Sequence, residues 1–150
     1  MPEITQRIQR DVARAPQTSM ALEAARLMSE RFIGSVVVTD ETGRVRGLFT
    51  ERDLMKRVVG EGRDPAATPL KEVMRTDVVT VSANESVERC LDLMRQHRTR
   101  HLMVFDDGEF RGLVSLRDLV LLLLDEKEQL IQELTHYINS EPATQRSAGA

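Results

Sequence analysis

The sequence predicts an α/β protein with two copies of a strand–helix–strand–strand–helix unit, paired by pseudo-twofold symmetry, and a long C-terminal helix. The first observation is a repeat: residues 11–54 and 77–119 follow one pattern, and both copies close on a Gly-x-x-Ser/Thr-x-Arg-Asp run. The second is size, because a unit of about 60 residues is marginally stable alone, so the copies should share a core. The third is the alternation of helix-like and strand-like hydrophobic spacing within each copy.

The offset between matching residues of the two copies is almost constant. It is 66 residues up to the pair Asp40 and Asp106, and 65 residues from Gly43 and Gly108 onward. The second copy therefore lacks one residue of its turn.

The same elements are expected in each copy from apolar periodicity, β-branched runs and turn residues. In copy one they are a strand at 12–13, a helix along 21–32, a strand at 35–39, a turn at 40–43, a strand at 44–49 and a helix from Thr50 to about Val59, where Gly60 ends it. In copy two they are a strand at 78–81, a helix along 87–94, a strand at 101–105, a turn at 106–108, a strand at 109–114 and a helix from Ser115.

This organisation divides the chain into six parts. They are an N-terminal segment at 1–10, motif 1 at 11–60, a linker at 61–76 with a short helix at 70–74, motif 2 at 77–125, a helix extension at 126–140 and a tail at 141–150 that we predict to be disordered.

The last helix continues far beyond its counterpart, because no Gly or Pro interrupts residues 116–140. Its apolar side chains recur every seven residues in two series, Leu123, Leu130 and Tyr137, and Leu124, Ile131 and Ile138, with Leu134 between them. One interpretation is an extended helix packed on its own domain. The other is a helical dimer contact, since a lone projecting helix would expose this stripe to water.

The composition favours a soluble cytoplasmic protein. Of the 150 residues, 41% are hydrophobic, which suffices for a globular core, although only 3% are aromatic. The longest apolar run, at 119–124, is too short to span a bilayer. The single Cys90 cannot form an intrachain disulfide and is expected to pack in the core. The net charge of −3 argues against a general nucleic-acid binder.

Ser115 and Asp118 are the strongest binding candidates, because both lie where a helix opens directly after a strand. A helix N-terminus offers free N–H groups and partial positive charge to a phosphate. The Ser115 hydroxyl can donate to a phosphate oxygen, and the Asp118 carboxylate suits the two hydroxyls of a ribose. The alternative is an ordinary capping pattern, in which the same two residues close the helix end.

A basic cluster distinguishes copy two from copy one. Arg98, Arg100 and His101 precede its central strand, where copy one has Phe32, Gly34 and Ser35. Arginines clamp phosphate oxygens with two parallel hydrogen bonds, and a histidine can add one more and gains charge below neutral pH. The alternative is a solvated basic helix end.

The tandem arrangement and the two closing runs resemble the CBS (cystathionine β-synthase) domain pair, or Bateman module, over roughly residues 11–124. The chain is similar to stand-alone bacterial members of this family. The resemblance implies a tandem βαββα fold, clefts between the motifs, adenine nucleotide ligands and homodimers. The stretch from Arg100 to Val104 is similar to the family's basic-pair-Leu-Pro-Val stretch, with Met103 in place of the usual proline.

The resemblance also assigns residues to two nucleotide sites, in which the aspartate grips the ribose and an apolar strand edge receives the base. We expect the main site in copy two, because Arg14 replaces Thr80 in copy one. The main site is predicted to use Val78, Val79, Thr80, Arg98, Arg100, His101, Ser115, Arg117 and Asp118. The second site is predicted to use Val12, Ala13, Thr50, Arg52 and Asp53.

No catalytic constellation is found, so no enzyme activity is expected. The histidines His97, His101 and His136 lack the carboxylate partners of a metal motif, and no metal is expected. Cys90 has no activating base nearby in the sequence.

Two functional hypotheses follow. The leading one is a non-catalytic regulatory module that binds an adenine nucleotide and acts as an energy or redox sensor for an unknown partner. AMP is the first candidate ligand, followed by ATP, ADP and NAD(H), and adjoining clefts could share a dinucleotide. The second is a structural dimer adaptor with degenerate, empty clefts. Both include a homodimer, and neither includes a membrane or nucleic acid.

Overall fold

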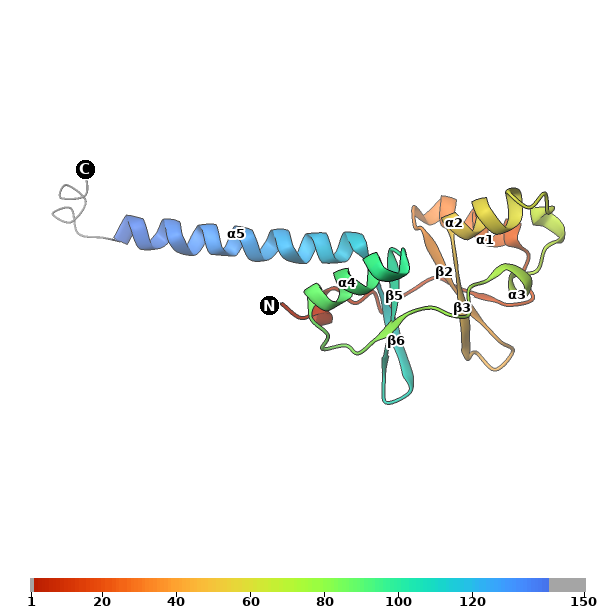
Figure 1. Ribbon diagram of the computed structural model, residues 1–150, viewed down its shortest axis with the longest axis horizontal. Helices are drawn as coiled ribbons and strands as arrows, with labels where there is room; N and C mark the ends of the chain where they lie inside the picture. The colour runs from red at the N-terminus through yellow and green to blue at the C-terminus, as the bar shows by residue number, and fades with distance from the viewer. Residues whose placement is uncertain (1, 141–150) are drawn as a thin grey trace.

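A computed structural model describes residues 2–140 and contains two three-stranded sheets, each covered by helices, with one long helix projecting from the body (Figure 1). The strand orders are β1-β2-β3 and β4-β5-β6. The predicted fold class, two repeated α/β units followed by a long C-terminal helix, is therefore confirmed. The tail predicted at 141–150 lies outside the described residues.

The bounds of most elements agree with the repeat. Copy one contains β1 (Arg14–Pro16), α1 (Ala21–Arg31), β2 (Ser35–Thr39), β3 (Val45–Thr50) and α2 (Glu51–Asp53) followed by a π-helix (Leu54–Val59). Copy two contains β4 (Thr80–Val81), α4 (Val87–His97), β5 (His101–Asp106), β6 (Glu109–Ser115) and α5 (Leu116–Ser140). Short turns of helix lie before each copy, at Ile4–Arg7, Pro65–Ala67 and α3 (Leu70–Val73).

The two sheets have matching pairings. In each sheet the first strand runs parallel to the second, which pairs antiparallel with the third. Val38 faces Gly47 in one sheet, Val104 faces Gly112 in the other, and the register shifts directly after both pairs. The one-residue difference between the copies is thus absorbed in the turn.

Three expectations about the elements were wrong. The first strand of each copy begins two residues late, at Arg14 and Thr80, because the residues before it are still crossing from the other copy's sheet. The helix after Thr50 is not a regular α-helix to Val59: after one turn it widens into a π-helix, which ends where the Gly60 N–H donates to the Met55 carbonyl at 2.7 Å.

Segments before each copy are exchanged between the copies. Ile4 and Ile8 lie in the core of copy two, beneath α4 and α5. Leu70 and Val73 of the linker lie in the core of copy one. Each core is therefore completed by residues that precede the opposite copy.

Backbone hydrogen bonds fix this exchange. Gln9 and Leu113 pair through both backbone groups at 2.8 and 3.0 Å, and Arg75 and Leu48 pair in the same way at 2.9 Å. These four residues stand in equivalent positions of the repeat. The pairings dock each incoming segment on the sheet of the other copy.

The glycine of each closing run is required by this close approach. A Cβ at Gly47 would lie 2.5 Å from the Arg75 carbonyl oxygen, and one at Gly112 would lie closer still to the Gln9 carbonyl oxygen. Gly112 also has φ +152°, which L side chains rarely adopt. The glycines are therefore structural residues of the exchange.

A third core cluster joins the two sheets face to face. Its buried members are Val37, Leu48, Met103 and Leu113, two from each copy in equivalent positions. Met103, where the similar family has proline, uses its N–H to donate to the Val79 carbonyl at 3.0 Å. The two copies thus contribute equivalent residues to this interface, as their pseudo-twofold symmetry requires.

The first turns of α5 pack on the body and the rest project from it (Figure 1). Leu119 and Leu122 are buried, and Arg7 pairs with Asp125 at 2.6 Å. Beyond this ion pair, Leu130, Ile131 and other apolar side chains are exposed, so this part of the helix is not packed on its own domain. Within residues 2–140, no helix is both long and apolar enough to cross a membrane.

Substituting Gly112→Ala should lower the free energy of unfolding by about 1–3 kcal/mol, since the added methyl group clashes with the Gln9 backbone. Denaturant unfolding measures this change. Gly34→Ala is the matched control, because a Cβ there meets its nearest atom at an ordinary 3.5 Å. Equal stabilities of the two variants would contradict the role assigned to the exchanged segments.

Candidate functional site

Both helix starts are closed by a reciprocal cap. The Asp118 carboxylate accepts hydrogen bonds from the N–H and hydroxyl of Ser115, each at 2.8 Å, while the Ser115 hydroxyl accepts from the Asp118 N–H at 3.2 Å. Thr50 and Asp53 form the same cap, with distances of 2.9 to 3.2 Å. The capping alternative for these residues is therefore confirmed, whatever else they bind.

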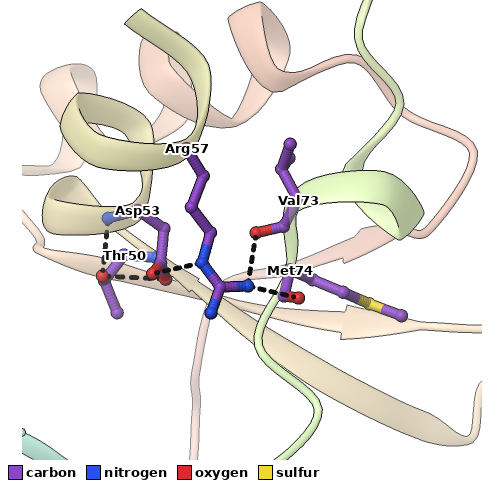
Figure 2. A network of polar contacts seen from close by, with 5 residues as sticks. All are labelled: Thr50, Asp53, Arg57, Val73 and Met74. Carbon is purple, nitrogen blue, oxygen red and sulfur yellow. Dashed lines mark hydrogen bonds and ion pairs between the residues drawn. The ribbon is translucent and has the colours of Figure 1, made fainter. Parts of the chain in front are cut away.

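Each capping aspartate is also tied to an exchanged segment. The Gln9 amide donates to the Asp118 carboxylate at 2.8 Å. In copy one the tie is indirect: Arg57 lies 3.8 Å from the Asp53 carboxylate and donates to the Met74 carbonyl at 3.2 Å. Figure 2 shows this bridge from the helix start to the end of α3. Both carboxylates thus stabilise the fold.

One cavity, cavity A, has a volume of about 640 Å³ and lies between the two copies. Copy two contributes the start of α5, and copy one contributes the approach to β1 and the turn from α1 into β2. The residues of cavity A include Gln9, Asp11, Val12, Ala13, Arg31, Phe32, Ile33, Gly34, Ser35, Arg100, His101, Leu113, Ser115, Leu116, Arg117, Val120 and Leu121.

Two smaller cavities, B and C, lie around the other helix start, with volumes of about 120 and 110 Å³. Cavity B is lined by Gly34, Thr50, Glu51, Arg52, Arg75, Arg98, Thr99, Arg100 and His101. Cavity C is lined by Leu48, Arg75, Asp77, Val78, Val79, His97 and Thr99. Nearly all of these are repeat counterparts of residues in cavity A, so B and C together form the pseudo-symmetric partner of A.

The cavities share walls. Gly34, Arg100 and His101 line both A and B, and Arg75 and Thr99 line both B and C. A ligand seated in A therefore lies next to the arginines of B.

The structure distributes the predicted site residues over the cavities in a different grouping. The helix start with Ser115 and Arg117 shares cavity A with Val12 and Ala13 of copy one. Val78 and Val79, predicted for that site, line cavity C instead, and Arg98 lies in cavity B. This grouping results from the exchange of segments between the copies, because the segment before each copy lies beside the helix start of the opposite copy.

Three predicted residues lie outside the cavity linings. Asp118 and Asp53 are buried in their caps, behind Ser115 and Thr50. Thr80 is exposed at the start of β4, where it pairs with Met103. Thr50 and Arg52 do lie together, in cavity B.

Sequence reasoning missed Gln9, Arg75, Glu51 and Thr99, which line the cavities. A signal for the first two existed. The apolar residues Ile4 and Ile8 match Leu70 and Met74 at the 66-residue register, so the repeat extends upstream of residue 11.

His101 stands at the wall between cavities A and B. Burial lowers the pKa of its imidazole below the usual 6.5, although the nearby carboxylates of Glu51 and Asp118 oppose this shift. This shift favours the neutral ring at pH 7, a form that offers one N–H donor. The positive charge at this wall comes from Arg100 and its neighbours in cavity B.

Cavity B is rich in unneutralised positive charge. Four arginines line it against one carboxylate, that of Glu51. Arg52 donates to the backbone carbonyl of Arg98 at 3.3 Å, which leaves its other donors available. The Arg75 Nε is buried, and residues 2–140 offer it no hydrogen-bond partner. An unpaired buried donor of this kind favours an anionic ligand.

Phe32 and Arg98 occupy equivalent positions and give the two sites different chemistry. Each ends a helix in the left-handed conformation, with φ of 54° and 50°, which is uncommon for residues other than glycine. Phe32 lines cavity A and is 95% exposed, whereas Arg98 lines cavity B. An exposed aromatic ring held at a cavity rim suits stacking on a planar ligand.

A protein-family model described as CBS domain matches residues 4–60 and 70–125. Both matches begin upstream of residues 11 and 77, and they include the exchanged segments around Ile4 and Leu70.

The chain is similar to a CBS domain-containing protein of Bacillus subtilis, YhcV, with 38% identity over 99 residues that cover 66% of this chain and 69% of that protein. The chain spans between 57% and 69% of the lengths of three curated relatives that it matches at 36% to 39% identity.

Solved structures with the same fold include a protein with CBS domains from Burkholderia ambifaria, at 34% identity and a TM-score of 0.76, covering 81% of this chain and 91% of that one. Another is a CBS domain protein from Pyrobaculum aerophilum complexed with AMP, at 26% identity and a TM-score of 0.70, covering 78% of this chain and 89% of that one.

Substituting Asp53→Ala should lower the free energy of unfolding by about 0.5–2 kcal/mol, because the carboxylate half of the α2 cap and the Arg57 bridge are both lost. Denaturant unfolding without any ligand measures this. Asp92→Ala is the control, since Asp92 pairs only with an exposed arginine on α4 and such surface changes stay within about 0.5 kcal/mol. A loss no larger than the control's would show that the cap does not stabilise the fold.

Proposed function

Because this chain belongs to the CBS-domain family and carries two CBS domains in tandem, we propose that it is a non-catalytic, cytoplasmic regulatory module that binds an adenine nucleotide. AMP is the first candidate, and ADP, ATP and NAD(H) are the others. Occupancy would report energy or redox state to a partner protein. The observation that carries this proposal is the junction of a large, partly apolar cavity with an arginine-lined one.

The phosphates are assigned to the wall between cavities A and B. Arg100 lines both cavities, and Arg75 and Arg98 stand behind it in cavity B. Arginine offers paired donors that match phosphate oxygens, and such bonds strengthen away from bulk water. The neutral His101 can add a single donor. Cavity B alone is too small for a whole nucleotide, but it can receive the anionic end of a ligand seated in A.

The base is assigned to cavity A. Its volume lies within the range of about 300–1,000 Å³ typical of small-molecule sites. Val12, Ala13, Ile33 and Val120 supply apolar walls, and Phe32 at the rim can close over a planar ring. The proposed main site therefore combines the helix start of copy two with the strand edge of copy one.

Ribose binding would require a local exchange of hydrogen bonds. Asp118 is the residue expected to grip the ribose hydroxyls, yet Gln9 donates to its carboxylate at 2.8 Å. A ribose would replace the Gln9 amide while the Ser115 cap stays in place. Because Gln9 belongs to the exchanged segment, this replacement offers a route from the ligand to the packing of the two copies.

A second site is assigned to the helix start of copy one, with Thr50 and Arg52 beside Val78 and Val79. Its cavities B and C are small and strongly basic. A dinucleotide is a candidate for the combined space, since A and B adjoin at Arg100 and His101. The AMP-bound relative from Pyrobaculum aerophilum supports adenine nucleotides as the ligand class.

The alternative function is a structural dimer adaptor with empty clefts. One observation favours it: both capping aspartates already have partners within the chain. The arginine cluster favours binding, since an unused cleft gains nothing from concentrated positive charge. Both alternatives include a homodimer.

A nucleotide at 100 times its dissociation constant should raise the free energy of unfolding by about 2.7 kcal/mol. Thermal unfolding with AMP, ADP, ATP and NADH in turn measures this. Arg100→Ala should weaken the best ligand about 10- to 100-fold, since hydrogen bonds to charged groups are worth about 1.5–3 kcal/mol. Arg95→Ala is the control, because Arg95 is exposed on α4 and pairs with Asp92. No shift with any of the four nucleotides would favour the adaptor.

Asp118→Ala should abolish the nucleotide-induced shift more fully than Asp53→Ala, because the main site lies at the helix start of α5. The two variants are well matched, since each removes one equivalent helix cap. The measurement is the ligand-induced change for each variant relative to its own unliganded stability. Equal losses would refute the asymmetry of the sites without refuting binding.

A further inference from the structure

The projecting part of α5 carries a continuous apolar stripe. Leu124, Leu130, Ile131 and Leu134 are each 54–55% exposed, and helical spacing places them on one face. The stripe begins at cavity A, which Val120 lines. Monomeric proteins rarely leave an apolar surface of this length uncovered.

Lys127 lies at the centre of this stripe. Every position three, four or seven residues away from it is apolar: Val120, Leu123, Leu124, Leu130, Ile131 and Leu134. In heptad terms, Val120, Lys127 and Leu134 occupy one core position, and Leu123 and Leu130 occupy the other. Leucines in the second position and a single lysine in the first are features of two-stranded parallel coiled coils.

Charge along the edges of the stripe decides how a second helix would lie. Helical spacing places Glu126 and Glu133 on the same edge, one residue before the core positions, whereas Lys127 lies within the stripe itself. In an antiparallel pair the glutamates of both helices would meet on one edge and repel. In a parallel, in-register pair, each edge brings Lys127 of one helix beside Glu126 of the other.

We propose that the occupant of this stripe is a second copy of the same chain, paired through α5 as a parallel, in-register coiled coil. Each Lys127 then extends from the apolar seam to the glutamate of its partner, and the two lysines leave the seam on opposite sides. The two bodies lie at the same end of the helix pair. This assigns a specific surface and orientation to the homodimer.

The first test is mass in solution, measured by sedimentation or light scattering on the full chain. The unmodified protein should be a dimer, and Leu130→Glu should dissociate it at least 100-fold more readily. Gln132→Glu adds the same charge to the opposite side of α5 and should leave the dimer intact. Thermal unfolding checks that both variants keep the body folded. A monomeric unmodified protein, or a dimer that Leu130→Glu does not weaken, would overturn the proposal.

Charge exchange tests the orientation. Glu126→Lys and Lys127→Glu should each weaken the dimer about 3- to 10-fold, and the double variant should recover the original affinity because the pair is restored with reversed sign. In an antiparallel dimer, Glu126→Lys would instead strengthen association by relieving repulsion between glutamates. That result would overturn the parallel arrangement.

Disulfide trapping gives an independent answer. Leu123→Cys and Leu134→Cys, as separate single variants, should each form a covalent dimer under mild oxidation. The two positions are about 16 Å apart along a helix, so an antiparallel pair can bring at most one of them against its own counterpart. Cys90 does not interfere, because it is buried and burial raises the pKa of its thiol to about 11. Trapping of only one variant, or of Gln132→Cys equally well, would contradict the in-register pairing.

Discussion

The fold depends on one reciprocal backbone contact. The segment before each copy pairs with the last strand of the other copy, Gln9 with Leu113 and Arg75 with Leu48. Gly112 and Gly47 make room for that approach. Because Ile4 and Leu70 enter opposite cores through these contacts, neither copy has a complete interior of its own. The same crossings bring the approach to each first strand beside the helix start of the opposite copy, and so create the cavities.

Local features of the sequence predicted the repeat, the hairpins and the helices well. Residues 35–39 form the expected buried strand, and Gly60 ends its helix as expected, because these outcomes depend on neighbours in the chain. The strand starts were wrong, and the predicted site residues lie in different cavities, for another reason. No local pattern says that Gln9 contacts Leu113, more than one hundred residues away. Only the match of Ile4 with Leu70, 66 residues apart, indicated that the segments upstream of each copy belong to the repeat.

The two copies share the same backbone fold and helix caps, and differ in a few residues that line their cavities. Both helix starts have the same cap, so the closing runs are accounted for by the fold before any ligand is considered. The differences lie at equivalent positions: Phe32 against Arg98, and Gln9 against Arg75. One half therefore presents an aromatic ring and an amide to its cavity, and the other presents two guanidinium groups. Divergence at these positions separates the chemistry of the two sites without disturbing the repeat.

The exchange of segments also sets the order in which the chain can fold during synthesis. Ile4 and Ile8 leave the ribosome before residues 81–122, which form the surface that buries them. A nascent chain that has emerged only as far as the linker must hold these isoleucines in water or in temporary contacts. Packing of this segment thus waits for synthesis of copy two, unlike the domain-by-domain order usual for multidomain chains.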